Sequence, residues 1–77
     1  MTEYEEVVVA IYRDALDIEV EGLDVDVFES GLLDSLGLVV LVAEIEERYG
    51  MRIAFETLDI DEFRTVRSLA GIVEAQA

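Results

Sequence analysis

Asp34, Ser35 and Leu36 are the residues of this 77-residue chain whose types and spacing could carry chemistry. They lie where a turn-rich segment, 28–33, gives way to a long run with helical periodicity that ends before Gly50. A serine in the first turn of a helix is exposed beside backbone N–H groups that have no partner within the helix. A phosphate on its hydroxyl would meet these N–H groups and the positive end of the helix dipole. Because Asp-Ser is also good capping chemistry, the local spacing leaves both interpretations open.

The sequence lacks the partners that a catalytic serine requires. A nucleophilic serine gives its proton to a base, commonly His or Lys, and the chain contains neither, since its five positive side chains are all arginines. Cysteine is absent, as are zinc motifs and glycine-rich phosphate loops. We therefore expect a protein that is not an enzyme. An enzyme relying on carboxylates such as Asp59 and Asp61 would have to show activity as the purified chain alone.

The many acids raise the question of calcium. Asp24 and Asp26 have the first spacing of an EF-hand loop, but Glu29 stands where that loop needs Gly and Ser35 where it needs Glu. We interpret Asp24 and Asp26 as solvated loop acids and expect no metal. Three later acids fit the first turn of a short helix, where the helix dipole favours them: Asp59, Asp61 and Glu62.

The net charge of −14 restricts the partners. Nucleic acid binding requires clusters of Lys and Arg and anionic membranes attract basic segments, so we expect neither. Such a field steers basic protein partners toward the chain, although the acids could serve solubility alone. The N-terminal residues are acidic, unlike a secretory signal, and the longest apolar run, 38–43, is far shorter than a membrane span of ~18 residues. We expect a cytoplasmic location without membrane insertion.

The N-terminal segment predicts an amphipathic helix. Thr2 and Glu5 have the spacing of a capping box, so the helix should begin at about Glu3 and end at Leu16 or Asp17. Apolar residues recur at helical spacing and should face the core: Tyr4, Val7, Val8, Ile11, Ala15 and Ile18.

Residues 18–33 predict a long connection. Gly22 and Gly31 interrupt it, and ordered loops of this length are uncommon and usually functional. Apolar residues every few positions should anchor it on the core: Leu23, Val25, Val27, Phe28 and Leu32. The alternation at 18–21 permits a short strand, which we reject because no second segment shares its period.

A second helix should span Ser35 to Tyr49, with Asp34 as its N-cap and Gly50 as its C-terminal stop. One stripe should face the core: Leu38, Leu41, Val42, Ile45 and Tyr49. Further apolar residues lie outside this stripe: Leu36, Val39, Val40 and Ala43. A helix that is apolar on two sides is either central or binds a partner.

The C-terminal third predicts a linker, a short helical turn and a final helix. Residues 51–58 should contribute Ile53, Phe55 and Leu58 to the core, and 59–63 fit one helical turn. Thr65 is a plausible N-cap for the last helix, whose buried stripe would be Val66, Leu69, Ala70 and Val73. The sum is an all-α bundle of three main helices and a minor one, forming one domain over residues 1–77.

Residues 28–36, Phe-Glu-Ser-Gly-Leu-Leu-Asp-Ser-Leu, resemble the phosphopantetheine attachment motif of acyl and peptidyl carrier proteins. The match extends to the order of helices and the long loop. The resemblance implies that Ser35, between Asp34 and Leu36, covalently carries 4′-phosphopantetheine, added from coenzyme A by a phosphopantetheinyl transferase. It also implies that the second helix recognises partners, through Leu36, Val39 and Val40 and the charged Glu44 and Glu47.

Two positions depart from the fatty-acid branch of this family. Carriers of that branch usually have an acid directly after Asp-Ser-Leu and another one turn on, where this chain has Gly37 and Val40. The start of the second helix is therefore more apolar. Residues 31–35 look more like discrete carriers of the D-alanyl type, and residues 58–65 look similar to stand-alone carriers of natural-product pathways.

The resemblance implies a non-catalytic, stand-alone and monomeric carrier acted on by partner enzymes. It would hold an activated acyl or aminoacyl group as a thioester for a pathway of the polyketide or nonribosomal-peptide type. An adenylating ligase or acyltransferase would load it, and a downstream synthase or transferase would receive the cargo. The alternative is an adaptor of the same fold that binds partners through the second helix without modification, and the response to Ser35→Ala separates the two.

Overall fold

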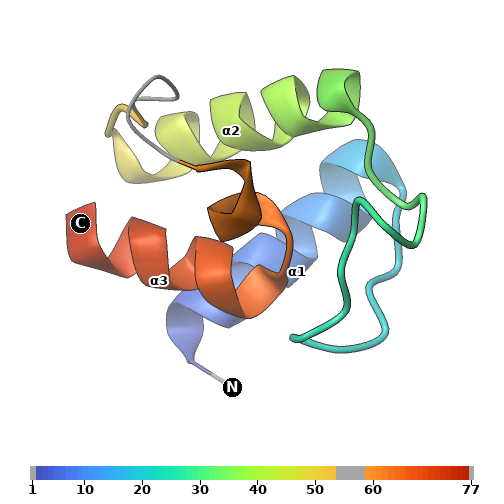
Figure 1. The fold of residues 1–77 in the computed structure, drawn as a ribbon. Coiled ribbons are helices and arrows are strands. Elements are labelled where there is room, and N and C mark those ends of the chain that lie inside the picture. Colours follow the sequence, from blue (N-terminus) through green and yellow to red (C-terminus); the bar gives the residue numbers. More distant parts are fainter. Residues whose placement is uncertain (1, 54–58, 77) are drawn as a thin grey trace.

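The computed structural model describes residues 2–53 and 59–76. The helices are α1 (Glu3–Leu16), α2 (Ser35–Tyr49), the 3₁₀ helix η2 (Ile60–Phe63) and α3 (Val66–Gln76). In these two ranges there is no strand, so the predicted all-α class is confirmed. α1 packs against both α2 and α3, and η2 packs on α3. The long α1–α2 loop covers one end of the bundle (Figure 1).

The helix ends lie where the capping residues predicted them. The Glu5 N–H donates to Thr2 Oγ1 over 3.1 Å, and the Thr2 N–H donates to Glu5 Oε1 over 2.8 Å, which completes the capping box of α1. α2 begins after Asp34 and ends at Gly50, whose φ of 62° is left-handed and suits a residue without a side chain. Thr65 Oγ1 accepts the Ser68 N–H over 3.1 Å at the start of α3, as predicted for an N-cap.

The core is formed by one stripe from each main helix. The predicted stripes of α2 and α3 are confirmed, with Tyr49 half-buried and stacked on Tyr4. On α1 the stripe differs from the prediction, because Ala15 is exposed, whereas Tyr12 is fully buried and Leu16, one turn further along the same face, packs against the core. Burial raises the pKa of the Tyr12 phenol. The buried side chains of the three stripes are Val8, Ile11, Tyr12, Leu38, Leu41, Val42, Ile45, Val66, Leu69, Ala70 and Val73.

The long loop contributes two side chains to the core. Val27 and Leu33 are buried, and the Leu33 N–H donates to the Val27 carbonyl over 2.9 Å. Leu32, predicted as an anchor, is exposed. The reason is that successive side chains of an irregular segment point in different directions, and Leu33 takes the core position. Leu23 and Phe28 pack against the core while half-buried.

The segment after α2 is held by a side chain of that helix. The Ile53 N–H donates to Glu46 Oε2 over 2.7 Å, and Ile53 is buried as predicted. Phe55 and Leu58, also predicted as core residues, lie outside the described residues. Within 2–53 and 59–76, no helix combines the length and the apolar character that crossing a bilayer requires.

Candidate attachment site at the start of α2

Ser35 is the first residue of α2 and is exposed. The N-cap before it, Asp34, accepts the Gly37 N–H at Oδ1 over 2.7 Å. Within the described part of the chain, the N–H groups of Ser35 and Leu36 make no hydrogen bond. The first turn of α2 carries no acidic side chain, so the positive end of this helix is offset only by Asp34. An anion attached to Ser35 therefore fits this position, because the Ser35 and Leu36 N–H groups are free to donate to it.

Gly37 allows the loop to approach α2 closely. A β-carbon placed on Gly37 would lie 2.8 Å from Leu33 Cδ1 and 3.2 Å from Asp34 Oδ1. Carbon atoms in contact are normally about 3.5–4.0 Å apart, so any side chain here would displace the buried Leu33 or the Asp34 cap. The acid that fatty-acid carriers usually have at this position would meet the same contacts.

Gly37→Ala and Gly71→Ala should therefore differ in stability. Gly71 lies within α3 and a β-carbon there would meet nothing within 4 Å, so alanine should stabilise the fold by about 1 kcal/mol through helix propensity. Gly37→Ala should be at least about 1 kcal/mol less stable than Gly71→Ala because of the close approach of Leu33. Urea unfolding of both variants measures the difference, and equal stabilisation would contradict the close contact.

Four large apolar side chains close to Ser35 in the sequence are exposed, and we call them the apolar patch: Leu32, Leu36, Val39 and Val40. Leu36 is 73% exposed and Val39 is 58% exposed, values far from those of core residues. Residues 35–43 carry no charge, and the acids Glu44, half-buried, and Glu47, exposed, come later on α2. The three apolar residues predicted to contact partners are thus available to do so. Leu32 joins them, which the sequence analysis missed because it assigned Leu32 to the core.

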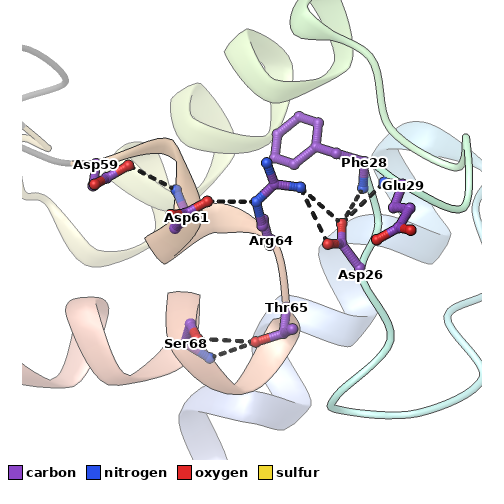
Figure 2. Close-up of polar contacts among 8 residues, drawn as sticks. All are labelled: Asp26, Phe28, Glu29, Asp59, Asp61, Arg64, Thr65 and Ser68. Carbon is purple, nitrogen blue, oxygen red and sulfur yellow. Dashed lines mark hydrogen bonds and ion pairs between the residues drawn. The ribbon is translucent and has the colours of Figure 1, made fainter.

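Ion pairs tie the loop to the η2–α3 junction. Arg64 NH1 lies 3.1 Å from Asp26 Oδ2, and Arg67 Nε lies 2.8 Å from Asp24 Oδ1. Figure 2 shows Arg64 between Asp61 and Asp26. Asp24, whose side chain is 75% exposed, is a solvated loop acid as interpreted, but both Asp24 and Asp26 also form ion pairs that were not predicted, with arginines 43 and 38 residues further along the chain.

These contacts also change how the acids titrate. The hydrogen bond from Arg67 holds the pKa of Asp24 below its usual value. The Glu29 N–H, with help from Arg64, does the same for the pKa of Asp26. Among the described residues, no group of three or more His, Cys, Asp or Glu side chains could hold a metal ion.

Comparison with known proteins defines the class. The family described as "Phosphopantetheine attachment site" matches residues 6–73, which include the whole loop and Ser35. This chain belongs to that family of carrier proteins. Its cofactor is covalent 4′-phosphopantetheine, and it is a non-catalytic carrier on which partner enzymes act. The resemblance inferred from the sequence is confirmed.

Three relatives are similar to this chain over most of its length. D-alanyl carrier proteins of Bacillus cereus strains B4264, AH187 and G9842 are each 39% identical over 67 residues. The matched region covers 84% of this chain and 85% of each relative. Proteins of this kind work with a phosphopantetheinyl transferase and with a ligase or acyltransferase.

Proposed function

We propose that the chain, as one carrier domain over residues 1–77, holds an activated small acid as a thioester on phosphopantetheine attached to Ser35. The observation that carries this proposal is the exposed Ser35 at the start of α2, beside unused N–H donors and without an acid in the first turn. Asp34 and Leu36 flank the attachment point. The family match and the D-alanyl carrier relatives support the same assignment.

The chain supplies the acceptor hydroxyl and its geometry. Ser35 Oγ attacks the phosphorus of coenzyme A that bears the pantetheine, a new P–O bond forms, and adenosine 3′,5′-bisphosphate leaves. We assign the base that takes the hydroxyl proton to the transferase, because this chain has no histidine or lysine. The Ser35 and Leu36 N–H groups are placed to stabilise the attached phosphate. Once bound, phosphopantetheine supplies the thiol that a cysteine-free chain lacks.

The cargo that the relatives favour is an amino acid. Their names state that they carry D-alanine, and an adenylating ligase would activate such a substrate with ATP before transfer to the thiol. A place in a polyketide or nonribosomal-peptide pathway is the extension that we draw from the resemblance of residues 58–65, with a synthase or transferase downstream. We further expect a monomer in the cytoplasm.

Loading the modified chain tests this proposal. The chain bearing phosphopantetheine is incubated with ATP, a D-alanyl carrier ligase and D-alanine, or with a panel of other small amino and carboxylic acids and their ligases. We expect one acyl group per chain by intact mass, released by hydroxylamine as expected for a thioester. Failure of all acids on a fully modified chain would contradict the proposed class of cargo, whereas a folded chain that takes no phosphopantetheine would favour the unmodified adaptor.

The apolar patch is the surface that we propose for partner docking, with Glu44 and Glu47 as charged contacts behind it. Val39→Asp places a charge in the exposed patch without disturbing the core, and burying that charge against a partner is unfavourable. We expect kcat/KM for phosphopantetheine transfer to fall at least about tenfold, equivalent to about 1.4 kcal/mol. Ala75→Asp, which adds the same charge at an exposed position of α3, should change it less than about twofold. Equal effects would show that net charge, not the patch, governs docking.

A further inference from the structure

Arg64 is bonded to the long loop through both its side chain and its backbone. Its NH1 lies 3.1 Å from Asp26 Oδ2, and its carbonyl accepts the Val27 N–H over 2.8 Å. Its Nε donates to Asp61 Oδ1 over 2.6 Å, so a carboxylate of η2 fixes the direction of the guanidinium (Figure 2). Planar guanidinium groups that engage two carboxylates are held more rigidly than single pairs.

Asp26 in turn shapes the loop that leads to α2. Its Oδ1 accepts the N–H groups of Phe28 and Glu29 over 3.0 and 2.9 Å, which closes a turn at this point (Figure 2). Val27, which follows Asp26 directly, is fully buried, and its carbonyl accepts the Leu33 N–H over 2.9 Å. The Asp26 carboxylate that pairs with Arg64 therefore also stabilises the turn, and the Val27 carbonyl beside it binds the backbone of Leu33.

Leu33 connects this turn to the attachment site. It is buried, it precedes the N-cap Asp34 directly, and its side chain lies against Gly37 so closely that no β-carbon fits there. A continuous series of contacts thus runs from the Arg64 carbonyl through Val27 and Leu33 to the first turn of α2, and the Arg64 side chain joins it at Asp26, the residue before Val27. Elements in direct contact show coupled energetics, whereas distant ones add independently.

We infer that Arg64 is a positioning residue that fixes the entry of the chain into α2 and thereby the orientation of Ser35 toward the transferase. The inference rests on the proposed role of Ser35 for its kinetic consequence, but not for the coupling itself. Without Arg64, the turn at Asp26 loses its bridge to η2, and Leu33 and the Asp34 cap gain freedom to move. The hydroxyl of Ser35 then spends less time in the geometry that the transferase requires.

Arg67, three residues after Arg64 and in the first turn of α3, provides a matched control. It pairs with Asp24 over 2.8 and 3.2 Å and with Glu5 over 3.7 Å, and its N–H donates to the Leu23 carbonyl over 3.1 Å. These contacts hold the earlier part of the loop to α1 and α3. They do not continue through Val27 to Leu33, so loss of Arg67 should affect the fold without disturbing the start of α2.

The experiment compares Arg64→Gln, Arg64→Lys, Asp26→Asn and Arg67→Gln as full-length chains. Phosphopantetheine transfer is measured as kcat and KM with a broad-specificity transferase and coenzyme A. We expect Arg64→Gln and Asp26→Asn to lower kcat/KM about tenfold, and Arg67→Gln to lower it less than twofold. Arg64→Lys should recover part of the loss, because lysine keeps the charge but cannot bridge both carboxylates in the same way. Urea unfolding of each variant shows whether rate and stability change independently.

Amide hydrogen exchange supplies a readout that needs no transferase. In Arg64→Gln the Leu33 and Gly37 amides should exchange at least about tenfold faster than in Arg67→Gln, at conditions where both variants are folded. Equal exchange and equal transfer in the two variants would overturn the inference. If the wild-type chain is not modified at all, the proposed function fails, and the exchange rates alone decide whether Arg64 holds the start of α2. If Arg64→Gln does not fold, Asp26→Asn makes the same comparison.

Discussion

Ser35→Ala is expected to abolish attachment of phosphopantetheine while leaving the chain folded. The substitution removes the only atom that can form the phosphate ester at this position, whereas the exposed side chain takes no part in the core. The cap of α2 belongs to Asp34 and is retained. The free energy of unfolding should change by less than about 1.5 kcal/mol, and urea unfolding together with intact mass after incubation with transferase and coenzyme A measures both quantities.

Ser30→Ala is the matched control for that result. Ser30 is also an exposed serine, and it lies in the α1–α2 loop five residues before Ser35, but it does not begin a helix. Its backbone N–H bond to the Asp26 carbonyl survives the change. Ser30→Ala should therefore be modified as fast as the wild-type chain. Modification that persists in Ser35→Ala, or is lost in Ser30→Ala, would place the attachment elsewhere than at the start of α2.

Ile45→Ala should strongly destabilise the fold. Ile45 is fully buried among the core residues that α2 presents to the bundle. Truncating a buried isoleucine removes its transfer free energy and leaves a cavity, which costs about 2–5 kcal/mol. In a chain of this size a core is small, so the variant should lie near the limit of cooperative folding, and thermal and urea unfolding should both show the loss.

Val39→Ala tests the orientation of the same helix from its other side. Val39 is 58% exposed, so its truncation should change stability by no more than about 0.5 kcal/mol. The informative quantity is the loss of unfolding free energy in Ile45→Ala compared with that in Val39→Ala. Similar costs for Ile45→Ala and Val39→Ala would mean that the buried face of α2 is rotated from the one described.

The elements that could be predicted from the sequence are those whose determinants are local. Thr2 with Glu5, and Asp34 with Gly50, lie within or beside the helices that they delimit, and the spacing of apolar residues along α2 and α3 identifies the faces that are buried. Ser35 was singled out by its expected place in the first turn, but this local spacing left a helix cap and an attachment point both open, and the resemblance of residues 28–36 to the carrier motif favoured attachment.

Contacts between distant segments escaped prediction. Arg64 and Asp26 are 38 residues apart, and no local pattern distinguishes an acid that has an arginine partner from one that is only solvated. The choice between Leu32 and Leu33 depends on the path of the loop, which the Val27 carbonyl and Gly37 determine together. On α1 the core side is occupied by Tyr12 and Leu16 rather than by Ala15, and the apolar spacing of this helix is compatible with either choice.

The most direct test is the mass of the folded wild-type chain after incubation with a broad-specificity transferase and coenzyme A, followed by fragmentation to locate the modified residue. Far-ultraviolet circular dichroism first establishes that the chain is helical. The account predicts a gain of one phosphopantetheine per chain, carried by Ser35. A folded chain that gains no mass, or gains it at a residue other than Ser35, would contradict the central claim.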